Sequence, residues 1–445
     1  MQRQIFHFEK YDNKKFSVIM SIVIVSVLVD SSFSYADTII DTTSKFHVLV
    51  FIVIAAVYVI GQYLILDFIK HKSYEGKIKG RFLTKSVSMV QYTVTLVTIF
   101  IVLQIIFTSQ YSTALLNWGS TISFSLAGSM LGLLALKFLS WYNLNRNFLV
   151  LLYGLAVLTN LCSIVLVLFL SSTAILGVPA VRDAHTHFTF PVFEPNTELG
   201  ILQYLVAVVD FAAFLLLWAS TVVLLYRYSR KMGKIKFWAL LSIPLISFTI
   251  ENVVIGPLVD GIEPSPNSLY EVVFGASIVP SISIGILFGV PFWIVARSIQ
   301  RGSIMRDYLI IAAWGLVFLQ ITSGDGVYTA PYPPFGLVGV SFIGLSCYLI
   351  LVGLYYSAVS ISQDVKLRQS IRNSLVDEPR LLDSIGSSQM EKDLQNRVMI
   401  IAKRNSDIMA EESGIEPTLT EDDAKQYLEE VLEELKNDKT RSALS

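Results

Sequence analysis

The 28 residues from 199 to 226, LGILQYLVAVVDFAAFLLLWASTVVLLY, form an almost unbroken apolar run. At ~1.5 Å rise per residue, a helix of this length exceeds the ~30 Å hydrocarbon core of a bilayer. Its one acid, Asp210, falls near mid-bilayer. Because a charge is costly to bury in lipid, an acid at that depth is a candidate functional residue.

The rest of the chain repeats this pattern of apolar runs separated by short polar loops. Of its 445 residues 53% are hydrophobic and 16% are charged, against about 25% charged residues in soluble proteins. We therefore expect an all-α fold, a polytopic transmembrane helix bundle in a lipid bilayer. Nine spans are predicted, and the count of eight or nine depends on the short span 308–322. The predicted spans are 46–69, 86–108, 118–139, 147–170, 199–226, 237–258, 270–296, 308–322 and 335–361.

Residues 1–36 have the features of a signal peptide. Basic residues precede an apolar stretch at 16–29, and Ser34 and Ala36 fit the −3 and −1 positions of a cleavage site. The stretch is short for a membrane span, so we predict cleavage after Ala36. The alternative is an uncleaved first helix, which leaves the later topology unchanged.

Basic residues are distributed unequally between alternate loops. One set of loops carries sixteen Lys and Arg, and the other set carries only Lys45 and Arg182. Because basic loops stay cytoplasmic, this bias predicts a multi-pass plasma-membrane protein whose mature N-terminus is outside and whose C-terminus is cytoplasmic.

Residues 362–445 form a polar cytoplasmic tail with 18 acids and 12 basic residues, after a bundle domain at 37–361. Two amphipathic helices are predicted in the tail, at 388–413 and 420–437. Their apolar faces would bind a cytoplasmic protein partner through 388–437, or the first would pair in a homodimer; a plain amphipathic helix is the alternative. The predicted partner-binding residues are Leu394, Val398, Ile401, Asn405 and Ile408 in the first helix, and Tyr427, Leu428, Val431 and Leu435 in the second.

Four polar residues lie inside predicted spans: Asp210, Glu251, Asn252 and Asn160. A proton or cation site needs a carboxylate that faces the bundle with amide oxygens near it, and these residues would supply that set if their helices are neighbours. The alternative is that each acid is protonated or hydrogen-bonded to a neighbouring helix.

One outer loop contains the only metal-like pattern, His185-x-His187. In an extended segment residues i and i+2 face the same side, so the two imidazoles would share an ion. Asp183 precedes the pair and Glu194 follows it, but two His and a remote carboxylate are weak evidence, and a plain polar loop is the alternative.

Several functions lack the residues that they need. None of the five His lies at mid-bilayer, which argues against a haem held by paired helix histidines. The chain has no HExxH and no P-loop, and its tail has no phospho-accepting His. With a net charge of −1 nothing indicates nucleic acid. The sequence predicts no catalytic residues and no cofactor.

The segment YYSAVSISQDVKLRQSIRNS at 355–374, which leads into LLDSIG at 381–386, resembles a group of uncharacterised multi-spanning membrane proteins of ammonia-oxidising archaea. Some of these resemble sensor input modules. The resemblance covers the last two spans and the tail, and it implies an archaeal plasma membrane and a sensory role without adding site residues.

These observations lead to one expectation and two alternatives. We expect an integral membrane sensor or interaction protein, in which outer loops 171–198 and 321–335 are coupled to a partner-binding tail. The first alternative is a secondary transporter or ion-coupled permease with an intramembrane carboxylate site. The second is a subunit of a membrane complex.

Overall fold

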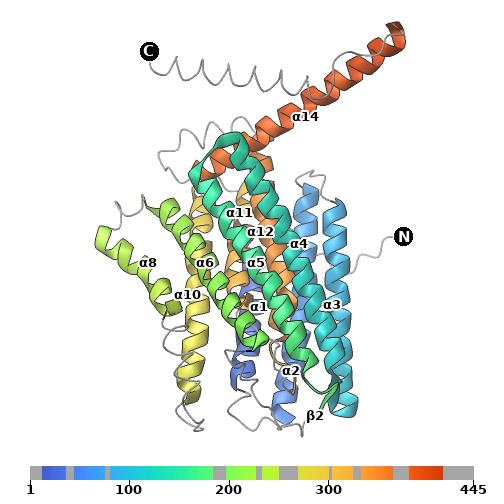
Figure 1. The fold of residues 1–445 in the computed structure, drawn as a ribbon, viewed down its shortest axis with the longest axis vertical. Helices are drawn as coiled ribbons and strands as arrows, with labels where there is room; N and C mark the ends of the chain where they lie inside the picture. The colour runs from blue at the N-terminus through green and yellow to red at the C-terminus, as the bar shows by residue number, and fades with distance from the viewer. Residues whose placement is uncertain are drawn as a thin grey trace.

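The computed structural model describes residues 13–36, 45–75, 81–183, 197–226, 233–249, 269–299, 303–323, 332–363 and 380–413. They form an all-α bundle of long helices that run along a common direction (Figure 1). Eight of the helices in these ranges are long and apolar enough to cross a membrane. The helices are α1 (Asn13–Ala36), α2 (Lys45–Glu75), α3 (Arg81–Thr108), α4 (Thr113–Asn145), α5 (Phe148–Leu176), α6 (Glu198–Leu225), α8 (Lys234–Thr249), α10 (Leu269–Ser298), α11 (Ile304–Ser323), α12 (Leu337–Gln363) and α14 (Arg380–Ser413).

The predicted spans correspond to these helices, and three of the differences in extent bear on the predictions. The short span 308–322 belongs to α11, whose 20 residues are enough to cross a bilayer. The loop predicted from residue 171 begins later, because α5 continues to Leu176 with Ser171 buried. Of the span 237–258, only the part up to Thr249 in α8 lies within the described residues.

The segment predicted to be a signal peptide forms α1, a helix of the bundle. Phe16, Met20, Val23 and Val27 are all buried, and their 4-3-4 spacing places them on one helix face. This face packs against α2, α10, α11 and α12. At Gly61 of α2 the approach is so close that a β-carbon would lie 2.4 Å from Val23 Cγ2. Cleavage after Ala36 stays a prediction, and this packing favours the uncleaved alternative.

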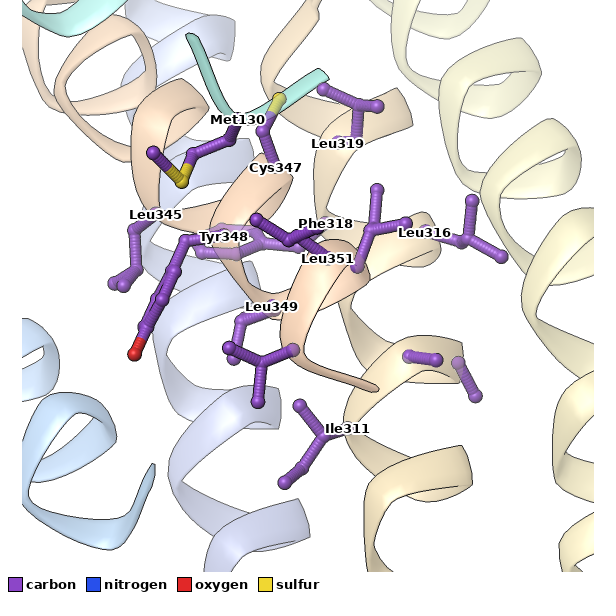
Figure 2. Packing of buried hydrophobic residues seen from close by; sticks show 14 of the residues in the cluster. Met130, Ile311, Leu316, Phe318, Leu319, Leu345, Cys347, Tyr348, Leu349 and Leu351 are labelled. Atoms are coloured by element: carbon purple, nitrogen blue, oxygen red, sulfur yellow. The ribbon is translucent and has the colours of Figure 1, made fainter. Parts of the chain in front are cut away.

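Helix α12 is the centre of the bundle. Every residue of its most apolar stretch is buried, and it packs most extensively against α11 and α4. Figure 2 shows Leu345, Tyr348, Leu349 and Leu351 of α12 beside side chains of α11. The close approach depends on glycine: a β-carbon at Gly353 would lie 2.5 Å from the backbone nitrogen of Ala312.

The two ends of the bundle carry different structures (Figure 1). At one end β1 (Gln110–Ser112) and β2 (Val181–Asp183) pair as a short antiparallel ribbon, with Tyr111 opposite Arg182. At the other end α14 lies across α4, α12 and α5 and then continues beyond them. We call these the ribbon end and the tail end. Of the loop set rich in Lys and Arg, described residues such as Lys72, Arg146 and Arg306 lie at the tail end, which the topology prediction assigns to the cytoplasm.

Candidate functional site: a central helix joined to the tail

At the ribbon end, α12 begins on a buried acid. Asp30 of α1 is fully buried, and its Oδ2 accepts hydrogen bonds from the backbone N–H groups of Gly336 (3.1 Å) and Gly339 (3.2 Å). The first N–H groups of a helix have no partner within the helix and carry partial positive charge, so a carboxylate there is stabilised. Asp30 therefore fixes the start of α12 to α1.

Aromatic side chains cover this contact from the ribbon end. Phe335, just before α12, stacks on Phe33 with ring centroids 5.2 Å apart and meets Phe51 edge-on. Farther out, Tyr332 stacks on Tyr111 of the ribbon at 6.3 Å. Burial raises the pKa of the Tyr332 phenol above its ordinary value of 10.0, so it stays neutral at physiological pH. The ribbon and the start of α12 are thus in direct contact.

At the tail end, α14 is anchored by its first three turns. Leu381, Leu382 and Ile385 are buried. A β-carbon at Gly386 would lie 2.4 Å from Ile361 Cγ2, so the backbone of α14 lies directly on the last turn of α12. The predicted start of this helix at 388 is wrong by eight residues, because the anchoring LLDSIG segment is itself helical.

Polar contacts fix this part of α14 against α4. Trp141 is fully buried, and its Nε1 donates to Gln389 Oε1 at 3.1 Å. Its carbonyl oxygen accepts from Ser388 Oγ at 3.0 Å. Lys392 Nζ donates to Ser140 Oγ at 2.7 Å one turn farther along. The side chains of α14 and α4 are therefore matched from Ser388 to Lys392, which defines a single register.

The same surface of α14 also contacts the end of α12 through Asp393, and α4 contacts α12 beside it. Ser362 Oγ donates to Asp393 Oδ2 at 3.3 Å, and Gln389 Nε2 donates to Asp393 Oδ1 at 3.0 Å. Lys137 of α4 lies over the ring of Tyr355 of α12, 4.8 Å from its centroid. Helix α12 is thus bonded to the tail at one end and to the ribbon-end cover at the other.

Beyond this anchor, α14 presents apolar side chains to the exterior. Leu394, Val398 and Ile401 are exposed by 49%, 39% and 58%. These are three of the residues predicted to bind a partner, and Asn405 is also exposed. The side chain of Ile408 and the residues Tyr427, Leu428, Val431 and Leu435 lie outside the described parts of the chain.

The predicted intramembrane polar set is only partly brought together. Asp210 of α6 accepts a short hydrogen bond from Ser163 of α5. Asn160, three residues before Ser163, donates instead to the carbonyl of Ala156 in its own helix at 2.8 Å. Glu251 and Asn252 lie outside the described residues. Asp210 thus bridges two neighbouring helices through a serine.

The predicted metal pair, His185 and His187, also lies outside the described residues. Within the described ranges, no group of three or more His, Cys, Asp or Glu is arranged to hold a metal ion.

Sequence reasoning missed Asp30 and the anchor residues of α14. Asp30 directly follows the apolar stretch 16–29, and the signal-peptide interpretation assigned it to a segment removed on maturation. A lone acid at the edge of an apolar run was the available signal, since such acids are retained where they have partners. Comparisons with protein-family models, with curated proteins and with solved structures find no match for this chain.

Proposed function

We propose that this protein is a multi-pass membrane sensor or interaction protein, in which α12 couples the ribbon end to a partner bound at the tail. The supporting observation is that α12 contacts both ends. Its start is bonded to Asp30 and covered by Phe335, and its last turn carries α14. Because close-packed helices shift as units, a displacement at the ribbon end would move the anchor of α14.

The partner would bind the exposed face of α14 beyond the anchor. An apolar face on a helix that leaves the bundle needs a covering surface, and a cytoplasmic protein or a second copy of the chain would supply it. The basic residues at the tail end support an orientation in which α14 lies in the cytoplasm.

Matched variants of α14 test this proposal. One variant changes the apolar face, Leu394→Ser with Val398→Ser and Ile401→Ser. Its control changes three exposed polar positions of the same helix, Asn396→Ser with Arg397→Ser and Arg404→Ser. After crosslinking in native membranes and purification, the proteins joined to wild type and control should be lost from the apolar-face variant. Equal capture by all three would contradict the proposal.

Transport is the alternative function, and the Asp210–Ser163 hydrogen bond between α5 and α6 favours it. A carboxyl group that bridges two membrane helices is a candidate proton or cation carrier. Proteoliposomes with internal pH-sensitive and cation-sensitive dyes separate the two functions. A flux that Asp210→Asn abolishes and the apolar-face variant leaves intact would replace the sensor proposal with transport.

We also infer that α1 stays in the mature protein, because its removal would leave the N–H groups of Gly336 and Gly339 without Asp30 and expose a buried face of α2. The intact mass of protein purified from native membranes should therefore include residues 1–36. A mass that begins after Ala36 would contradict the inference.

A further inference from the structure

Helix α3 has a polar face directed into the bundle and an apolar face directed outward. Its buried residues include Thr84, Gln91, Thr95 and Thr98. Its most exposed large hydrophobic residues are Phe82, Met89 and Phe107 at 85%, 74% and 80%. Lipid accounts for the apolar outer face, but the polar inner face needs polar neighbours inside the protein.

Those neighbours come from α2 and α12. Gln91 Nε2 donates to the Tyr58 hydroxyl at 3.3 Å and to the Ser341 carbonyl at 2.9 Å. Gln62 Nε2 donates to Thr95 Oγ1 through a short hydrogen bond. We call these five residues the α2–α3–α12 seam. Gln91 lies ten residues into α3, ~15 Å from its start, near the middle of a ~30 Å bilayer core.

The hydrogen bonds of the seam determine how the side-chain amides of Gln62 and Gln91 are oriented, and therefore which atom of each lacks a partner. Thr95 Oγ1 donates to the Gln91 carbonyl at 2.9 Å, so it must accept from Gln62, which turns the nitrogen of Gln62 toward it. Gln91 must likewise turn its nitrogen toward the Ser341 carbonyl, because two oxygens would repel each other. Gln62 Oε1 and Gln91 Oε1 are then buried acceptors for which the described residues supply no donor.

Both side chains are almost completely buried, with 1% of Gln62 and none of Gln91 exposed. A buried acceptor without a donor is costly, so the occupant of this site must bring hydrogens or positive charge. The five seam residues are all uncharged. A cation at this depth would lack a counter-charge in the seam, whereas a neutral donor needs none.

We propose that the α2–α3–α12 seam is an internal hydration site, in which bound water donates to the amide oxygens of Gln62 and Gln91. The site places water at mid-bilayer beside α12. It lies on α2, α3 and α12, whereas Asp210 lies on α6 and its partner Ser163 on α5, so it is independent of the Asp210 site.

X-ray radiolytic footprinting of the full-length protein in nanodiscs tests the site, because hydroxyl radicals formed from bound water oxidise the side chains beside it. Tyr58 should be oxidised at least several-fold faster than Phe51 and Phe68, which are equally buried in the same helix. Oxidation of Tyr58 no faster than that of Phe51 and Phe68 would show a dry seam and overturn the proposal.

A double variant, Gln62→Met with Gln91→Met, removes both amide oxygens that lack a donor. The single variant Gln62→Met removes one of them and serves if the double variant fails to fold. Tyr58 oxidation should fall several-fold while Phe68 oxidation stays constant. An unchanged rate at Tyr58 in a folded variant would overturn the proposal. Footprinting of wild type in NaCl and in choline chloride at equal ionic strength should give equal rates, and protection of Tyr58 by Na⁺ alone would assign the site to a cation instead.

Discussion

Helices α12 and α6 have nearly the same length and the same mean hydropathy, yet they occupy opposite positions in the bundle. The most apolar stretch of α12 is completely buried, whereas 39% of that of α6 is buried. In lipid, apolar side chains gain little by facing one another, so hydropathy does not decide which helix is central. Small residues do: Gly344 and Gly353 let α12 approach its neighbours at backbone distance.

The largest expected effect comes from adding one methyl group to the central helix. Gly353→Ala would place Cβ 2.5 Å from the backbone nitrogen of Ala312, which cannot rotate away. We expect a loss of about 3 kcal/mol in the free energy of unfolding. The control is Gly132→Ala in α4, where the nearest side-chain atom lies at 3.8 Å. This variant should be neutral or stabilised by up to ~1 kcal/mol. Thermal unfolding in detergent measures both, and equal midpoints would show that α12 is not held by close approach.

The next effect concerns the start of α12. Asp30→Ala leaves the N–H groups of Gly336 and Gly339 buried without their acceptor. We expect a loss of about 2 kcal/mol, with a smaller loss for Asp30→Asn, which keeps one acceptor. Ser32→Ala is the control, because within the described residues Ser32 bonds to the Leu28 carbonyl of its own helix and to no other helix. Thermal unfolding compares the three, and an Asp30→Ala midpoint equal to that of Ser32→Ala would rule out capping.

A smaller and local effect is expected where α14 is anchored. Trp141→Phe removes the hydrogen bond to Gln389. It should lower the free energy of local opening of the first turns of α14 by about 1 kcal/mol, which speeds amide exchange there roughly fivefold. Trp118→Phe is the control, since Trp118 lies at the other end of α4 and is 65% exposed. Hydrogen exchange read by mass spectrometry should change at 381–393 only in the first variant.

The smallest effect is expected at Asp210. Asp210→Asn keeps an oxygen that accepts from Ser163, on a helix that is largely exposed. We expect a change within about 0.5 kcal/mol, well below that of Asp30→Ala. A loss as large as that for Asp30→Ala would show that α6 depends on its acid as α12 does, and would remove the contrast between the two helices.

The sequence predicted the bundle and most of its helices, because spans of 20 or more apolar residues are determined by the bilayer. It could not rank the helices, since hydropathy is equal in α6 and α12 while packing differs. Asp210 drew attention because it interrupts a long apolar run. Asp30 did not, although it is the more buried acid, because its partners Gly336 and Gly339 are some 300 residues away. The start of α14 was misplaced because LLDSIG is too short to show a helical period.

The burial of α12 also concerns the order in which the protein is made. Of the described apolar helices, α12 is the last to be synthesised, yet α1, α2, α3, α4 and α11 pack against it. Until α12 leaves the ribosome, α4 and α11 lack the surface that they bury against it. Asp30 of α1 and Gln91 of α3 likewise reach their partners at the start of α12 only after that segment has been synthesised. The contacts that join α1, α3, α4 and α11 to α12 therefore form late in translation.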